Sequence, residues 1–461
     1  MNVKHLLLSC ATLTGMLVTS CTNDELISVN SDPVGNAITF SPSVGRTTRA
    51  TETTLKNLGD FAVYARSVDH KGSLYANFII GNADDKSPEI AKKANLNVSG
   101  TEGFWNLSRK VYWPTGVQRV LFWALTTLQN GDTYTDTDVL GDNGKLTFGD
   151  AGPEITGFSP IRAERENTSY MDGTNQHDLV GAFTPQQASE SQSNVPLNFK
   201  HELSQIKILA KVGDGQPDNS RRVTIKGAWI VNASSKGDFK ANYDWNGGNP
   251  KDSPKWENLT SKVAYGSLFE TPKKLDSESS KDAVDILSTA SGTGSLMLIP
   301  QTVEAWNKNN AGTDGPRQEY NACETTDAYI LLYCRIESVH KGSSHEGDDN
   351  IGTGTDEHYH QLFPVGNYDE TKYGYTCVPV KIEWLPGKRY TYTLNICGAN
   401  SGGGVYPPVL PPDVPEDPKP VPDDKKPGDP VLDSEISFTV TVEGWTDDET
   451  WKPGGNDLNF N

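Results

Sequence analysis

Apolar and polar residues alternate in short runs along most of the chain. The clearest run lies at residues 436–443, where Ile436, Phe438, Val440 and Val442 occupy every second position and Ser, Thr or Glu stands between them. A period of two is typical of a β-strand with one buried face. Few apolar stretches repeat at helical spacing, so the pattern predicts an all-β protein built from short strands and turns.

The strand-like runs fall into two groups, which predict two β-sandwich domains in tandem at residues 36–190 and 191–400. The first group includes AITFSPSV, LGDFAVYARSV and RVLFWAL, and the second includes RRVTIKGAWIVN, DAYILLYCRIES, CVPVKIEW and KRYTYTLNIC. The last two runs flank Leu385-Pro386-Gly387, a turn sequence, and are expected to form a hairpin. The polar tract at residues 126–176 is expected to form long surface loops.

A proline-rich segment follows the second group. Residues 401–433 contain VYPPVLPPDVPEDPKPVPDDKKPGDP, which predicts a linker rather than a strand or a helix. Residues 406–430 would span roughly 75 Å if they were extended at ~3.1 Å per residue. The strand within the C-terminal segment, residues 434–461, could therefore pair with its own domain or with another molecule, and the pattern leaves both possibilities open.

The N-terminus predicts export. Residues 1–20 place Lys4 and His5 before a short apolar segment, and Val18-Thr19-Ser20-Cys21 has the form of a lipoprotein cleavage site. We expect a lipid on Cys21 and a polar tether at residues 21–35. An ordinary signal peptide and a buried free cysteine are the alternatives. A lipid on Cys21 would hold the mature chain on a membrane surface outside the cytoplasm.

The net charge excludes one class of partner, and the cysteines leave two possibilities open. Lys and Arg number 41 against 60 Asp and Glu, which gives a net charge of −19 and a pI near 4.9. This balance argues against nucleic acid as a partner. Export permits disulfides among Cys323, Cys334, Cys377 and Cys397, but Cys334 and Cys397 lie in strand-like runs, where small buried thiols are equally expected.

Catalytic patterns are weak. His345, His358 and His360 are the best metal candidates, but such residues more often lie in polar loops, and we predict no metal site and no cofactor. The chain has no G-x-S-x-G motif, and no pair of carboxylates is marked as a general acid and base. We therefore do not expect an enzyme.

Several motifs, taken in order, resemble the Mfa-like, or fimbrillin-type, lipoproteins of Bacteroidota. The resemblance covers nearly the whole chain. It rests on the lipoprotein signal, the arginine-containing loop Gly45-Arg46-Thr47-Thr48-Arg49-Ala50, LGDFAVYA, VYWP, FKHELSQIKI, LIPQ, WLPGKRYTYTLNI and the terminal FTVTVEGW.

The resemblance implies a type V pilus subunit with two transthyretin-like β-sandwich domains, anchored at the cell outer membrane and active in adhesion. In such subunits a protease cuts after an arginine, here Arg46 or Arg49, and thereby removes the first strand. A donor strand from an identical or related subunit then fills the vacated groove. The donor residues here would be Ile436, Phe438, Val440 and Val442.

The main alternative is a surface glycan-binding lipoprotein of a polysaccharide-uptake system. The chain has 10 Trp and 17 Tyr residues, which could form platforms for sugars, although aromatic residues in strand-like runs more often pack in cores. A glycan binder needs neither a detachable first strand nor a donor strand. These two features therefore favour the fimbrial interpretation, with a host or bacterial surface receptor as a further possible partner.

Overall fold

The computed structural model describes most of the chain between residues 37 and 445, together with residues 457–458. The described ranges, with short gaps inside some of them, are 37–44, 55–93, 105–128, 139–161, 170–187, 194–213, 220–276, 282–287, 295–307, 326–341, 350–351, 357–414, 419–445 and 457–458.

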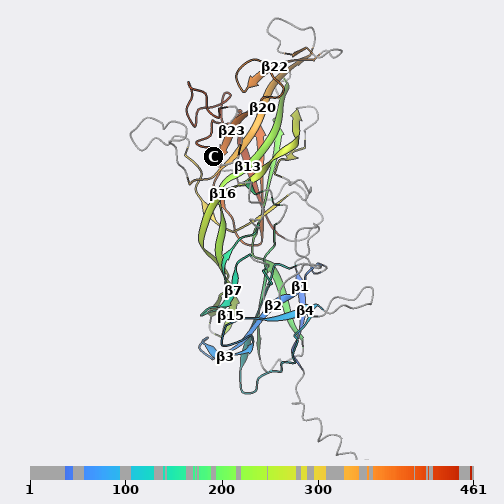
Figure 1. The fold of residues 1–461 in the computed structure, drawn as a ribbon, viewed down its shortest axis with the longest axis vertical. Helices are drawn as coiled ribbons and strands as arrows, with labels where there is room; N and C mark the ends of the chain where they lie inside the picture. Colours follow the sequence, from blue (N-terminus) through green and yellow to red (C-terminus); the bar gives the residue numbers. More distant parts are fainter. Residues whose placement is uncertain are drawn as a thin grey trace, which may run out of the picture.

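The described residues form strands and no helix, which confirms the predicted all-β class. Within this part of the chain, no helix is available that could cross a membrane. Figure 1 shows an elongated molecule, with β1 to β4 toward one end and β20, β22 and β23 toward the other.

The first sheet closes on itself. One edge of β2 pairs with β6 and the other pairs with β3 and β4, so the order β2-β4-β5-β1-β11-β10-β6 returns to β2. Its strands are β1 Thr39–Val44, β2 Phe61–Val68, β3 Leu74–Ile80, β4 Glu89–Lys93, β5 Trp105–Asn106, β6 Arg119–Thr126, β10 Val180–Gln187 and β11 Asn194–His201. Because β11 belongs to this ring, the chain leaves the first sheet between His201 and Ser204.

Two further sheets pack face to face. The smaller sheet runs β17-β12-β25-β26-β27, with β18 beside β12, and the larger contains β13, β16 and β20 at its centre. The strands of the smaller sheet are β12 Ser204–Val212, β17 Val284–Asp285, β18 Leu296–Leu298, β25 Lys388–Ile396, β26 Ser437–Gly444 and β27 Asp457–Leu458. Those of the larger are β7 Lys145–Phe148, β8 Pro153–Phe158, β9 Tyr170–Met171, β13 Ser220–Lys240, β16 Lys255–Asp276, β20 Tyr329–Lys341, β21 Asn350–Ile351, β22 Glu357–Phe363 and β23 Gly374–Pro379.

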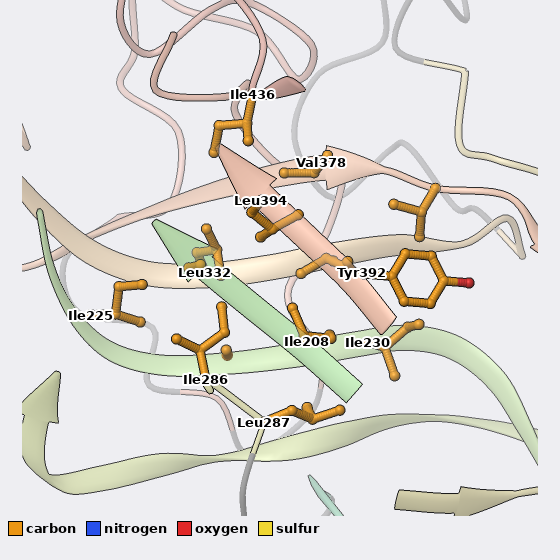
Figure 2. Close-up of a cluster of buried hydrophobic side chains, with 14 of the residues drawn as sticks. Ile208, Ile225, Ile230, Ile286, Leu287, Leu332, Val378, Tyr392, Leu394 and Ile436 are labelled. Carbon is orange, nitrogen blue, oxygen red and sulfur yellow. The ribbon is translucent and has the colours of Figure 1, made fainter. Parts of the chain in front are cut away.

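Apolar side chains from these two sheets form one core between them. Figure 2 shows Ile208 of β12 and Leu394 of β25 facing Ile225, Ile230 and Leu332 of the larger sheet. All five are fully buried, which is the expected arrangement for two facing sheets whose strands alternate inward and outward. Two short pairs complete the described strands: β14 Tyr243–Asn246 with β15 Asn249–Asp252, and β19 Thr302–Val303 with β24 Ile382–Glu383.

The proline-rich segment, as far as it is described (residues 401–411, 414 and 419–433), is folded, contrary to the extended linker that its composition predicts. It covers the outer face of the larger sheet, where Val405, Leu410 and Val414 share a buried cluster with Trp229 and Tyr329. Its two ends meet, because the Tyr406 amide donates to the Asp429 carbonyl at 2.9 Å and the Gly428 amide donates to the Tyr406 carbonyl at 2.9 Å. Proline has no amide hydrogen to donate to a β-ladder, but its presence does not prevent the segment from packing its apolar side chains against a sheet.

Two local predictions are wrong. Leu385-Pro386-Gly387 does not close a hairpin, because β23 pairs with β20 in the larger sheet while β25 pairs with β12 and β26 in the smaller one. The turn instead follows β24, which pairs with β19, and leads into β25 of the smaller sheet. The tract at residues 126–176, expected as loops, contains β7, β8 and β9, and β8 pairs with β13.

Candidate functional site

The first described strand fills a groove in the closed first sheet. β1 pairs in parallel with β11, from Thr39 with Asn194 to Val44 with Phe199, whereas the other described pairings of this sheet are antiparallel. Ile38, Phe40 and Val44 point into the core, and Phe40 is only 1% exposed. Each buried apolar side chain of this size contributes about 1.5–3 kcal/mol.

Aromatic rings line the groove beneath β1. The Phe61 ring lies 6.1 Å from Phe40, 6.0 Å from Trp105 and 5.2 Å from Phe199, measured between ring centroids. Sequence reasoning did not identify Phe61, Trp105 and Phe199 as groove residues, because each sits in an ordinary strand-like run and only the parallel position of β1 brings them together. Loss of β1 would expose these rings to water.

The predicted donor strand, β26, lies in the smaller sheet. β26 pairs antiparallel with β25 over its whole length, from Lys388 with Gly444 to Asn395 with Ser437. Ile436 and Val440 are buried, whereas Phe438 and Val442 are half-buried and pack against the same core. In this structure, therefore, the strand pairs within its own chain.

The two strands share one pattern of apolar and hydroxyl side chains. ITFSPSV at residues 38–44 aligns with ISFTVTV at residues 436–442, so that Ile, Phe and Val recur at the first, third and seventh positions. The fifth position holds Pro42 in one strand and Val440 in the other, and the positions between hold only Ser or Thr. Comparing the two ends of the chain would have revealed this match, which the sequence analysis did not use.

Trp445 anchors the end of β26 beside the first sheet. Its ring stacks on His201 with centroids 4.0 Å apart and planes 6° apart, and its amide donates to the Gly387 carbonyl at 2.9 Å. His201 Nδ1 lies 2.8 Å from Asp178 Oδ2, and both side chains are buried. Since His201 ends β11, the anchor of the C-terminal strand adjoins the strand that borders the β1 groove.

Glu202, the next residue, is a buried carboxyl whose pKa lies well above the ordinary value because burial disfavours its charged form, with Asp252 and Asp178 adding repulsion. The folded chain therefore holds this proton more tightly than the unfolded chain does. The resulting cost to stability is absent below the ordinary pKa of Glu and grows as pH rises through the folded-state pKa.

We expect Glu202→Gln to stabilise the chain near neutral pH, because Gln mimics the protonated acid. The gain should vanish near pH 4 and grow toward neutral pH, where the carboxyl of the unfolded chain ionises while the buried carboxyl of the folded chain resists ionisation. Urea unfolding of both forms between pH 4 and pH 8 measures it, with exposed Asp244→Asn as the control. An equal difference between the two forms at both pH values would contradict the assignment.

Several predicted site residues lie outside the described part of the chain. These are Cys21, Arg46, Arg49, Cys323 and His345. Val44, the last residue of β1, precedes Arg46 by two positions and Arg49 by five in the sequence. Their lipidation and cleavage therefore stay predictions.

The remaining cysteines are free thiols. Cys334 and Cys377 are buried, and burial raises the pKa of both; burial also raises the pKa of Cys397 to about 11. Such thiols carry little thiolate at neutral pH and are poorly reactive.

His358 and His360 lie on β22 opposite β20. The His340 ring of β20 lies 5.2 Å from that of His358 and 4.9 Å from that of His360, between centroids. Among the described residues, no group of three or more His, Cys, Asp or Glu side chains is placed to hold a metal ion.

One family model matches more than half of the chain. The family model described as fimbrillin-like matches residues 48–330. No curated protein matches the chain. A solved fimbrial protein from Bacteroides vulgatus ATCC 8482 is 16% identical with a TM-score of 0.44, covering 88% of this chain and 99% of that one.

Two further solved structures are similar at lower scores. A fimbrial assembly protein from Parabacteroides distasonis ATCC 8503 is 9% identical, with a TM-score of 0.35, and covers 89% of this chain and 99% of that one. The tip fimbrial protein Mfa3 from Porphyromonas gingivalis, with a C-terminal truncation, is 10% identical, with a TM-score of 0.29, and covers 87% of this chain and 99% of that one.

Proposed function

The chain belongs to the fimbrillin-like family, and on that premise we propose that it is a structural subunit of a surface fimbria that polymerises by exchanging β1 for the β26 strand of a second copy. The family is one of fimbrial structural proteins and not of enzymes. Family membership supports the fimbrial role, and the exchange of strands is what we propose in addition.

The observation that carries the proposal is the match between ITFSPSV and ISFTVTV. Placed in the β1 groove in the same direction, Ile436 would replace Ile38, Phe438 would replace Phe40 and Val442 would replace Val44. Each would meet a site already shaped for the same side chain. The Ser and Thr residues between them would keep the outward positions of β1.

Three of the four sequence differences favour the incoming strand, and only Ser437 in place of Thr39 does not. Pro42 has no amide proton and cannot donate to a ladder, whereas Val440 can. Thr439 and Thr441 stand where β1 has Ser41 and Ser43, and β-branched residues fit strands better. Strand ISFTVTV should therefore bind the groove more strongly than the strand it replaces.

A cut in the loop after β1 would start the exchange. While β1 is covalently attached, its high effective concentration excludes competitors; once it is cut at Arg46 or Arg49, it competes as a separate peptide. The donor must also leave β25, so filling the exposed aromatic groove has to outweigh the lost cis pairing. Lipid on Cys21 would hold the precursor at the outer membrane, exposed on the cell surface, before this step.

The test uses surface material from cells that produce either the full chain or a chain ending at Asp433. Unheated samples on a denaturing gel should show a ladder for the full chain and a single band for the truncated one, because the truncated chain lacks β26. An Arg46→Ala and Arg49→Ala double variant should also give a single band, since β1 would stay attached.

Two controls make the result decisive. Ser437→Ala changes an exposed position of β26 and should leave the ladder intact. A ladder from the truncated chain, with folded monomer shown by its urea transition, would rule out β26 as the donor.

A further inference from the structure

Two cavities meet at Trp245. One has a volume of about 620 Å³ and includes Arg66 and Tyr243 in its lining, and the other has a volume of about 550 Å³ and includes Arg119 in its lining; Trp245 lines both. The β14–β15 hairpin supplies Trp245 and the turn between β2 and β3 forms the opposite side. Figure 1 shows β3 and β15 on the same side of the molecule, near β7.

The Trp245 ring is fixed in place by the turn it covers. A Cβ atom on Gly72 would fall 2.3 Å from the ring Cγ, so the indole lies directly on bare backbone. Tyr243 Oη donates to the Gly72 carbonyl at 2.7 Å and ties the hairpin to the same turn. The half-exposed indole is thus held ready as a flat apolar surface between the two cavities.

Arg66 presents a rigid cation to the larger cavity. Its guanidinium carbon lies 4.9 Å from the Phe78 ring centroid and 5.1 Å from that of Phe148. Its Nε, at 2.8 Å, and its Nη2 both donate to the Tyr75 carbonyl. In the described part of the chain, it makes no ion pair with a carboxylate. A guanidinium has five N–H donors, so most of its donors are left for a ligand.

Lys86 adds a second cation to the same lining. It is exposed, it adopts a φ of 58°, and its ammonium group makes no ion pair within the described residues. In a chain with a net charge of −19, two cations beside one cavity and without carboxylate partners are a local exception. They mark a place for an anion.

One carboxylate, Asp150, lines the same cavity. It would repel a multiply charged group such as a phosphate, but it can accept hydrogen bonds from hydroxyl groups. The cavity thus combines a flat aromatic ring, a site for one negative charge and an acceptor for hydroxyls. A sugar ring that carries one carboxylate has all three complementary features.

We propose that the cavities at Trp245 bind an acidic saccharide, with the carboxylate of a uronic or sialic acid on Arg66 and Lys86, its apolar ring face on Trp245 and the neighbouring sugar in the smaller cavity. This site goes beyond the structural role in a fimbria and does not depend on strand exchange. It would give a subunit its own contact with surface glycans.

Titration of the full chain by isothermal calorimetry tests the site. The probes are sialyllactose and a hyaluronan tetrasaccharide, which carry the two kinds of sugar acid, and lactose is the neutral control. We expect saturable binding of at least one acidic probe, about tenfold or more tighter than that of lactose, because charge-assisted hydrogen bonds to the carboxylate are lost with lactose.

Arg66→Met and Trp245→Ala should each weaken binding by about tenfold or more. Lys86→Asn should weaken binding less. Because Lys86 is exposed and Asn tolerates positive φ, this variant should fold. It therefore keeps the test valid if the other two variants do not fold. Arg109→Met removes the same charge at an exposed residue that pairs with Glu89, and should change nothing. Acidic probes that bind no better than lactose, or an Arg109→Met variant as weak as Lys86→Asn, overturn the site.

Discussion

Phe40→Ala is expected to lower the free energy of unfolding of the full-length chain by about 3–5 kcal/mol, and to leave the stability of the polymer unchanged. The first effect follows from the buried position of Phe40 against Phe61. The second follows from the proposed exchange, because the assembled subunit no longer contains β1 and Phe438 of the neighbour occupies that place. Urea unfolding of the precursor and heat dissociation of the ladder measure the two quantities.

Phe199→Ala is the matched comparison, since Phe199 belongs to β11 and remains in the groove after the exchange. It should weaken both the precursor and the polymer. Ser41→Ala, at an exposed position of β1, should weaken neither. A polymer of Phe40→Ala chains that dissociates at lower temperature than the wild type would mean that β1 stays in the fibre.

Trp445→Ala should lower the stability of the monomer by about 3–5 kcal/mol and loosen β26 in particular. The indole fills a cluster that joins both parts of the molecule, with Leu203, Phe239 and Ile299, and it stacks on His201. Without it, the strand keeps its pairing with β25 and the burial of Ile436 and Val440, but its C-terminal end loses its anchor. Hydrogen exchange at the amides of residues 437–444 should therefore become faster than at those of β12.

Trp445→Phe keeps an aromatic ring on His201 and should lose less stability than Trp445→Ala. If strand release limits assembly, the Ala variant should also form ladders sooner than the wild type. Unchanged exchange at residues 437–444 in the Ala variant would show that Trp445 does not hold the strand.

The alternation of apolar residues predicted the two strands on which the proposed function rests. ITFSPSV and ISFTVTV have one buried face each, so their period of two is unobscured. YILLYCRI of β20 reads as a continuous apolar run because both of its faces are covered, one by the smaller sheet and the other by the proline-rich segment.

Which strands pair with each other was harder to predict from the sequence than where the strands lie. Leu385-Pro386-Gly387 has the composition of a hairpin turn, yet nothing local distinguishes a turn within a sheet from a crossing between sheets. The same limit applies to the candidate site. Phe61 and Phe199 lie far apart in the sequence, and only the closure of the first sheet brings their rings within 5.2 Å of each other, with Phe40 on Phe61.

In a fibre held together by strand exchange, the proline-rich segment would link neighbouring subunits. This link would be short while the segment is docked and long once it detaches. With loop 406–430 docked, only residues 431–435 separate its closed ends from the donor strand, a reach of roughly 17 Å. Undocked, the loop adds roughly 75 Å of chain. A pulled fibre would therefore respond stiffly until the loop detaches from Trp229 and Tyr329, and would then lengthen subunit by subunit, dissipating tension before any donor strand is withdrawn.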